Sequence, residues 1–443
     1  MAALLLPFGY PGYPAKEVAE HTAASREYLT QIGIDFTDSA DIIVLQDCEQ
    51  AIRIAKQNVW DCVIVLVATW LEAPNVIHVL SAAGLEQMPM LLWAHDNVYD
   101  ENEGAVISFG AVASAGVMRE SFEELGYRFK FVVGNPGDTG LTEEILNFYK
   151  AAVAVRKLRC QRLGMIGYAS MGMYTGLADP IKVKRQFGTE IVQVDQYSLI
   201  SQIPKMEKKA VQDASDALQA EWSLSPNVEP EQVKRSSAVL LRLQQMVKEQ
   251  ALDAVTVKCQ YEMSIEYGFT PCVALSLLGG NMPVSCEGDV YLLLSQMILA
   301  NISGETTTYG DLLAFLEDGI ICAACGFAPK CFLAAAKPNI DKHTALYSGM
   351  LITTPFKEQS VTVIRLANDG DGFKLHLIKG RTEQLQDFHE IGCPAYAGSV
   401  IRFENKDVSC FKQEVMSQHY AIVPGDHVEA VRDFCGILGI RVV

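Results

Sequence analysis

The hydrophobic positions of residues 1–160 fall into short apolar runs separated by amphipathic stretches. Stretches such as AKEVAEHTAASREYLTQIG carry apolar residues at helical spacing. The apolar runs read ALLLPFGY, DIIVLQD, DCVIVLVAT, MPMLLWAHD and FKFVVGN. Alternation of buried strands with helices is typical of a parallel sheet. The pattern therefore predicts a first α/β domain at residues 1–160.

A second cycle of the same kind fills residues 161–340, with strand-like runs in RLGMIGYAS, EIVQVDQ and DAVTVKCQ and a long amphipathic stretch, PEQVKRSSAVLLRLQQMVKEQ. We expect a second Rossmann-like α/β domain there. After residue 341, SVTVIRLANDGDGFKLHLIKG alternates at period two around an Asn-Asp-Gly turn, the pattern of an antiparallel hairpin. The fold class is thus α/β, closed by a small antiparallel β domain at 341–443 with a final strand and helix.

The composition narrows the classes of partner. A formal net charge of −17 argues against nucleic acid and anionic membrane surfaces, since binding to phosphates depends mostly on Lys and Arg. The longest apolar stretch, CVIVLVATWL, has about half the length that a membrane span needs. Apart from a single C-x-x-C, the twelve cysteines lack paired spacings, which predicts reduced thiols and a cytoplasmic location. A hydrophobic fraction of 49% favours a homo-oligomer.

Nucleotide-binding motifs are missing from the sequence. FGYPGYP after the first run has no G-x-G-x-x-G, and no G-x-x-x-x-G-K-[ST] occurs, so neither NAD nor a nucleotide is expected. The glycines of GYASMGMYTG follow a strand-like run and suit close approach of a ligand, although a plain turn is the commoner use. Cys322 and Cys325 form a C-x-x-C without further zinc ligands, and Cys259, Cys272 and Cys286 stand singly. Buried thiols are the favoured interpretation of these cysteines.

Carboxylates follow two neighbouring strand-like runs of the second domain. Glu262 comes after DAVTVKC, and Glu287 and Asp289 lie in CEGD. Ligands bind at this edge of open α/β sheets, although acids before an apolar helix also serve as caps. His419 begins another strand-like run, where a core or interface histidine is the common alternative. Two carboxylates and an imidazole suit Mn²⁺ or Mg²⁺ better than Zn²⁺.

Several segments in order resemble the L-fucose/L-arabinose isomerase superfamily of metal-dependent aldose–ketose isomerases, namely KCQYEM, YGFTPC, CEGDV, SGMLITTPF, VTVIRL and HYAIVPGDH. They cover residues 255–443. The resemblance implies that Glu262, an acid of the CEGD segment and His419 bind a divalent metal, usually Mn²⁺, with Mg²⁺ or Co²⁺ as substitutes. Fucose-type members use an aspartate in the middle position, which favours Asp289 and keeps Glu287 as the alternative.

The resemblance also implies the reaction, which moves a carbonyl between C1 and C2 of a sugar through an enediolate. Glu262 and Asp289 are then the predicted proton-transfer residues. The expected substrate is a pentose, a deoxy sugar or a modified sugar such as sulfoquinovose. Many relatives carry His-Cys-Gly where this chain has Ala324-Cys325-Gly326, so any contact from that histidine is missing. A sugar-binding or regulatory homologue without turnover, and a metal-dependent aldolase or epimerase, are the alternatives.

Aromatic residues gather at the predicted strand ends of the first domain. In the resembling family this edge completes the substrate pocket of a neighbouring subunit, which implies a homo-oligomer built on trimers, such as a hexamer. Ordinary loop-closing aromatics are an equally good interpretation. The predicted substrate-binding residues are Tyr10, Trp70, Trp93 and His95 of this edge, with Met171 and Tyr174 of the glycine-rich loop.

Overall fold

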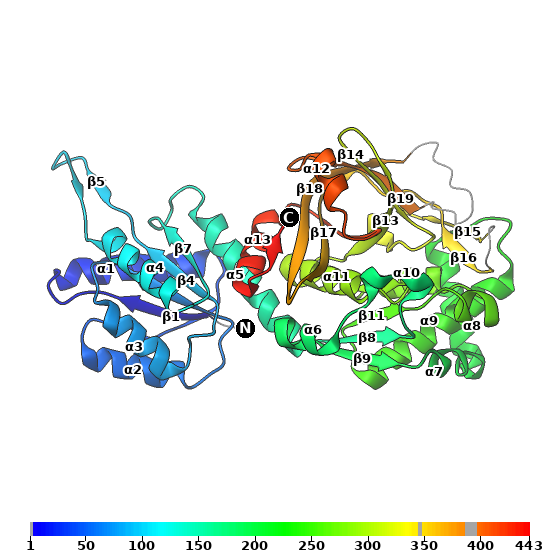
Figure 1. The fold of residues 1–443 in the computed structure, drawn as a ribbon, viewed down its shortest axis with the longest axis horizontal. Coiled ribbons are helices and arrows are strands. Elements are labelled where there is room, and N and C mark those ends of the chain that lie inside the picture. The colour runs from blue at the N-terminus through cyan, green and yellow to red at the C-terminus, as the bar shows by residue number, and fades with distance from the viewer. Residues whose placement is uncertain (1–2, 344–347, 386–396) are drawn as a thin grey trace. The chain divides into compact units, whose positions relative to one another are not determined.

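The computed structural model describes residues 3–343, 348–385 and 397–443 (Figure 1). The chain divides into two compact units. The first unit consists of Met1–Arg156 together with Glu429–Gly439, and the second consists of Lys157–Val428 together with Ile440–Val443. The first division lies close to the predicted boundary after residue 160.

The first unit is built on a parallel sheet with the strand order β2-β1-β3-β4-β7. The strands are β1 (Ala3–Phe8), β2 (Phe36–Asp38), β3 (Cys62–Val67), β4 (Met90–Ala94) and β7 (Phe129–Val133). The helices are α1 (Ala15–Gln31), α2 (Leu45–Ala55), α3 (Ala73–Ala83), α4 (Ala111–Glu124), α5 (Leu141–Cys160), which continues into the second unit, and α13 (Val428–Leu438). Every residue of β1, β3 and β4 is buried, as expected for strands covered on both faces. One face of the sheet packs against α2, α3 and α4. A short hairpin of β5 (Val98–Asp100) and β6 (Ala105–Ile107) follows β4.

The run DIIVLQD is not the strand that its apolar residues predicted. The strand β2 precedes it, and Ile42 forms only an isolated bridge to Phe8. The carboxylate of Asp47 accepts hydrogen bonds from the backbone N–H groups of Ile43 and Val44, both at 2.9 Å. These hydrogen bonds cap the N-terminus of helix α2. The capping interaction therefore outweighs the apolar pattern that predicted a strand here.

The second unit contains a parallel sheet with the order β12-β11-β8-β9. Its strands are β8 (Arg162–Ile166), β9 (Glu190–Val194), β11 (Ala254–Val257) and β12 (Val284–Cys286). Its helices include α6 (Pro180–Phe187), α7 (Gln196–Ile200), α8 (Lys208–Glu221), α9 (Pro230–Gln250), α10 (Cys272–Gly279) and α11 (Val290–Ser303). The predicted amphipathic stretch is helix α9. The chain runs from β8 to β9 on one side and later to β11 and β12 on the other, so the switch point of the sheet lies between β8 and β11.

A sheet that is antiparallel except for β21 follows in the same unit, with the order β17-β20-β13-β14-β19-β18-β21. Since β17 also pairs with β18, the sheet closes on itself. Its strands are β13 (Thr308–Phe315), β14 (Gly319–Ala324), β17 (Gln359–Asp369), β18 (Gly372–Gln384), β19 (Ala397–Phe403), β20 (His419–Pro424) and β21 (Arg441–Val442). The predicted hairpin is confirmed as β17 and β18, which pair from Gln359↔Thr382 to Asp369↔Gly372.

The antiparallel sheet begins before residue 341, because β13 and β14 belong to it, and helix α13 belongs to the first unit. A small sheet of β10 (Ser223–Leu224), β15 (Asn339–Lys342) and β16 (Met350–Ile352) and the short helix α12 (Val408–Glu414) complete the described elements. Among the described residues, none of the helices is both long enough and apolar enough to cross a bilayer.

Candidate functional site

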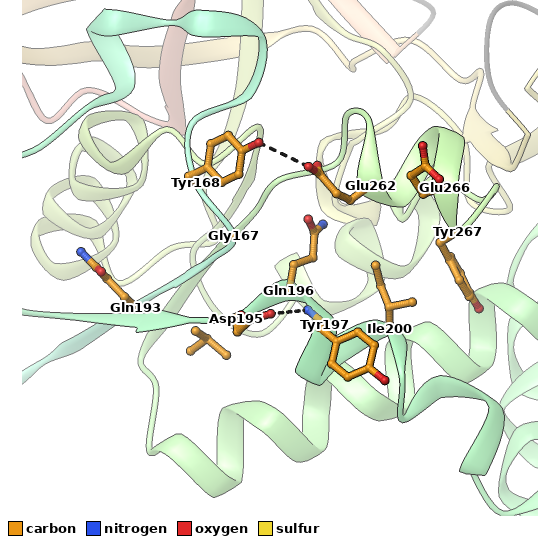
Figure 2. Close-up of a pocket in the computed structure, with 11 residues that line it drawn as sticks. Gly167, Tyr168, Gln193, Asp195, Gln196, Tyr197, Ile200, Glu262, Glu266 and Tyr267 are labelled. Carbon is orange, nitrogen blue, oxygen red and sulfur yellow. Dashed lines mark hydrogen bonds between the residues drawn. The ribbon is translucent and has the colours of Figure 1, made fainter.

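A cavity of about 760 Å³ lies at the carboxyl ends of β8, β9 and β11 (Figure 2). The position is the switch point of the parallel sheet, where open α/β sheets bind ligands. The lining residues are Gly167 and Tyr168 after β8, Gln193 to Tyr197 and Ile200 around the end of β9, and Glu262, Glu266 and Tyr267 after β11. Of the predicted site residues, Glu262 lines this cavity.

Glu262 begins the single helical turn Glu262–Glu266, directly after Tyr261, whose φ of 64° is strained for a residue with a side chain. The hydroxyl of Tyr168 donates to the Glu262 carboxylate at 3.3 Å, as Figure 2 shows. The ammonium group of Lys258 pairs with the same carboxylate and lies 3.5 Å from the centre of the Tyr168 ring. Burial raises the pKa of Glu262, but Lys258 and then Tyr168 lower it by more, so the net pKa is below its ordinary value. Glu262 is therefore an ionised carboxylate held at the cavity.

Asp289 caps helix α11, as one of the two sequence interpretations predicted. Its Oδ1 accepts from the backbone N–H of Leu292 at 2.9 Å. Its Oδ2 accepts from Arg365 at 2.8 Å and lies 2.8 Å from Nδ1 of His419. Burial raises the pKa of Asp289, but Arg365 and His419 outweigh it and hold the pKa well below its ordinary value. The carboxylate of Asp289 is thus already engaged by three groups of this chain.

The second ring nitrogen of His419 faces two further carboxylates. Its Nε2 lies 3.0 Å from Oδ1 of Asp311 and 3.3 Å from Oε2 of Glu287. These contacts lack hydrogen-bond geometry, and within the described residues all three buried atoms are without a hydrogen-bond partner. Burial lowers the pKa of His419, but Asp311, Asp289 and Glu287 raise it well above its ordinary value overall. We call His419, Asp289, Glu287 and Asp311 the His419 cluster.

The backbone of CEGD is shaped to place this cluster. Glu287 has a φ of 65°, and its carbonyl accepts from the N–H of Ser170 at 2.7 Å. Gly288 has a φ of 70°, and a Cβ there would lie 2.2 Å from the carbonyl oxygen of Tyr168. Only glycine permits this approach of the CEGD loop to the loop after β8. The strain is stored at the point where the carboxylates meet the histidine.

The structure therefore groups the sequence candidates in two sets. Glu287, Asp289 and His419 lie together, while Glu262 lies at the cavity with Lys258. In the described part of the chain no hydrogen bond or ion pair joins Glu262 to the His419 cluster. Asp311 was not among the predicted residues, and it lies on β13 directly opposite His419 of β20. Its position follows from strand pairing and leaves no mark in the local sequence.

Met171 and Tyr174 lie in the loop after β8 and are exposed, Tyr174 to 86%. Neither lines the cavity. Tyr174 lines a separate hollow of about 340 Å³ with Thr175 and Tyr291. Ala324, at the position where many relatives carry histidine, is buried in β14. Cys322 is buried and Cys325 is partly exposed, and neither belongs to a disulfide.

The predicted substrate residues of the first unit differ in accessibility. Trp93 is fully buried, and its indole N–H donates to the carbonyl of Gly134 at 2.9 Å, so the structure places it in the core. His95 is also buried, with Nε2 2.6 Å from the hydroxyl of Ser25. Burial, helped by the neighbouring His21, lowers the pKa of His95 to about 4. Tyr10 is partly exposed, and Trp70 keeps 39% of its surface.

Comparison with known proteins finds no matching family model. Curated relatives named sulfoquinovose isomerase align over most of the chain. The protein of Alkalicoccus urumqiensis is 21% identical over 80% of both chains, and that of Priestia aryabhattai is 21% identical over 87% of this chain and 86% of its own. The protein of Clostridium sp. (strain MSTE9) is 25% identical over 66% of this chain and 67% of its own.

Among solved structures, a periplasmic solute-binding protein of Actinobacillus succinogenes with bound D-allose covers 69% of this chain and 92% of its own, at 12% identity and a TM-score of 0.16. At this low TM-score, no conclusion about fold or function follows from the similarity. The curated relatives are all named as isomerases, and they support the interpretation of this chain as an enzyme of the aldose–ketose sugar isomerase type.

Proposed function

We propose that this chain is a metal-dependent aldose–ketose isomerase whose substrate is a sulfonated sugar such as sulfoquinovose. The observation that carries the proposal is the His419 cluster, in which a buried imidazole nitrogen faces two buried carboxylate oxygens, one strand away from the ionised Glu262 at the cavity. The names of the curated relatives favour the reaction and the class of sugar.

The residues of the His419 cluster fit a divalent metal. Nε2 of His419, Oε2 of Glu287 and Oδ1 of Asp311 converge as buried atoms without hydrogen-bond partners in the described structure. An imidazole with carboxylate oxygens suits Mn²⁺. Asp289 is less suited, because Arg365 and Leu292 already occupy its oxygens. We therefore favour Glu287 over Asp289 as the middle ligand. When bound, such a metal stabilises the negative charge of an enediolate.

Glu262 is the proposed base that moves the proton between C2 and C1. Its carboxylate is ionised and faces the cavity, where the reacting carbons of a sugar would have to lie. Lys258 fixes one oxygen of the carboxylate, and the Tyr168 hydroxyl orients the other. A carboxylate held in this way accepts the proton from one carbon and returns it to the next.

The charge of the cavity bears on the choice of sugar. Its lining includes the carboxylates of Asp195, Glu262 and Glu266, and none of its described lining residues is Arg or Lys. An anionic sulfonate is therefore unfavourable in the cavity as the single chain forms it. We infer that the cation for a sulfonate comes from outside this lining, and a neutral aldose is the second candidate that the acidic lining favours.

The proposal is tested with purified protein that has been stripped of metal and resupplied with Mn²⁺. Sulfoquinovose, D-glucose and L-fucose are incubated separately in D₂O, and the products are identified by NMR. We expect a ketose from sulfoquinovose, with any solvent deuterium located at C1 or C2, and loss of turnover in excess chelator. Cleavage products would instead favour an aldolase, and binding without turnover would favour a regulatory homologue. Full activity after verified metal removal would contradict the metal site.

A further inference from the structure

Two buried thiols lie beside the His419 cluster. Cys286 ends β12, and Cys259 follows the neighbouring strand β11, where Val257 pairs in register with Cys286. The sulfur atoms of Cys259 and Cys286 and a carboxylate oxygen of Glu287 all lie within 4.8 Å of one another. The prediction of buried thiols is confirmed for both cysteines, which stand singly in the sequence but are brought together by adjacent parallel strands.

Two features of the surroundings suit a ligand at this group. Glu287 is 6% exposed, and its carboxylate forms no hydrogen bond through Oε2 in the described residues, although this oxygen lies 3.3 Å from Nε2 of His419. The hydroxyl of Tyr309 lies 2.6 Å from the sulfur of Cys286, where it is able to donate to a thiolate. The Tyr309 ring also packs edge-on against His419, with the ring centres 5.6 Å apart. The thiols thus have a built environment that continues into the His419 cluster.

We propose that Cys259, Cys286 and Glu287 form a second metal site, selective for a soft divalent cation such as Zn²⁺. Two thiolates and one carboxylate are a donor set that zinc accepts and Mn²⁺ does not favour. Two sulfur ligands at about 2.3 Å from a tetrahedral zinc ion are roughly 3.8 Å apart. The present spacing therefore needs to close by no more than about 1 Å. Binding converts both thiols to thiolates and releases their two protons to solvent.

The second site shares Glu287 with the site proposed for Mn²⁺. Zn²⁺ bound to the thiols draws the Glu287 carboxylate toward the two sulfur atoms and away from Nε2 of His419. Zinc then acts as an inhibitor of the isomerase rather than as a substitute for Mn²⁺. This consequence rests on the proposed function, whereas metal binding by the thiols does not.

The binding test uses the full chain, reduced and free of metal, titrated with Cd²⁺ as a spectroscopic substitute for Zn²⁺. We expect an ultraviolet thiolate-to-Cd²⁺ charge-transfer band that saturates at about one equivalent, and about two protons released per Zn²⁺ in weak buffer. Cys259→Ala and Cys286→Ala are each expected to raise the half-saturating Cd²⁺ concentration roughly tenfold or more. The matched control is Cys435→Ala, a buried thiol of the first unit. Two single variants keep the test valid if one of them fails to fold.

A wild-type protein with titratable thiols but no charge-transfer band would overturn the second site, as would a band unchanged in both variants. In the activity arm, Zn²⁺ is added to the Mn²⁺-loaded enzyme and inhibition is expressed relative to each protein's own rate. We expect Cys259→Ala to need roughly tenfold more Zn²⁺ for half-inhibition. A Cd²⁺ band in a protein that isomerises no sugar would defeat the proposed function and leave the thiol site standing. Isomerisation by a protein that shows no Cd²⁺ band would support the proposed function and defeat the thiol site.

Discussion

The residues at the carboxyl ends of the strands differ in chemical character between the two parallel sheets. We call these ends the first edge, in the first unit, and the second edge, in the second unit. Each sheet has a switch point, between β1 and β3 in the first unit and between β8 and β11 in the second. At the ends of β3 and β4 the first edge presents neutral groups, the half-exposed Trp70 and the buried His95 with its lowered pKa. Its ion pairs, Arg26 with Asp38 and Asp41, lie to one side at the end of β2. The second edge presents ionised carboxylates, with Glu262 beside Lys258 and Asp289 beside Arg365.

The comparison shows that a parallel sheet provides a position for a site, at the carboxyl ends of its strands. The residues that follow each strand determine which chemistry is possible there. In the second unit the charges are held by fully buried cations and by backbone strain at Tyr261 and Glu287. Such strain persists only where the surrounding structure enforces it. At the first edge the buried His95 is instead hydrogen-bonded to the neutral Ser25, and the ion pairs that Arg26 forms at the end of β2 are partly exposed. Under the proposed function, proton transfer is expected at the second edge and sugar binding at the first.

The largest expected effect tests the chemical role of the second edge. Glu262→Gln keeps the shape of the side chain but removes the proposed base, so kcat is expected to fall by about 10²- to 10⁴-fold. Steady-state kinetics at saturating Mn²⁺ measure the change. Glu266→Gln is the matched control, because it removes one negative charge from the same cavity. Equal effects of the two variants would show that the edge acts through its charge alone.

The next effect concerns the stability of the second edge. Arg365→Met leaves the Asp289 carboxylate buried without its cation, and both side chains have no exposed surface. We expect a loss of about 3–5 kcal/mol in the free energy of unfolding, measured in urea. The double variant Arg365→Met/Asp289→Asn is expected to recover part of this loss, since no uncompensated charge remains. An unchanged single variant would show that the pair contributes little to stability.

The response to acid separates the two edges. The pKa of His95 is about 4 in the fold against an ordinary 6.5, so below pH 6.5 the unfolded chain binds a proton that the folded chain does not. Its contribution is therefore complete above pH 6.5 and declines by about 3 kcal/mol as the pH falls to 4. Asp289 keeps its contribution throughout this window, because its folded pKa lies below its ordinary value.

The acid response is measured by urea unfolding at a series of pH values. Three of the four tryptophans, Trp60, Trp70 and Trp93, report on the first unit by fluorescence. His95→Gln is expected to flatten the pH dependence between 6.5 and 4, and the exposed His78→Gln serves as the control. A slope that His95→Gln leaves unchanged would contradict a buried neutral His95.

The smallest expected effect asks whether the two edges complete one site in an oligomer. Glu262→Gln and Trp70→Ala proteins are mixed under conditions in which subunits exchange, and a fraction of the wild-type activity is expected to return. Some interfaces would then pair an intact second edge with an intact first edge. Glu262→Gln mixed with His419→Ala is the control, because both changes lie in the second edge. Exchange of subunits without recovered activity would defeat the shared site.

Periodicity predicted the elements but could not predict which strands lie side by side. The run SVTVIRLANDGDGFKLHL specified its hairpin because both strands and the turn are local. Asp311 was missed because its pairing with His419 joins strands far apart in the sequence. Arg365 was hidden for the same reason, as one residue of an apolar strand whose partner is the cap of α11. The facing thiols of Cys259 and Cys286 likewise depend on the pairing of β11 with β12.

The membership of helix α13 in the first unit sets an order on the synthesis of the protein. This helix packs Val431 and Phe434 into the interior, and its Asp433 forms an ion pair with Lys130 at 2.7 Å. The ribosome synthesises residues 157–428, nearly the whole second unit, before it reaches helix α13, so these contacts form late. The first unit therefore emerges early with part of its apolar surface uncovered and completes its packing only when the far end of the chain returns to it.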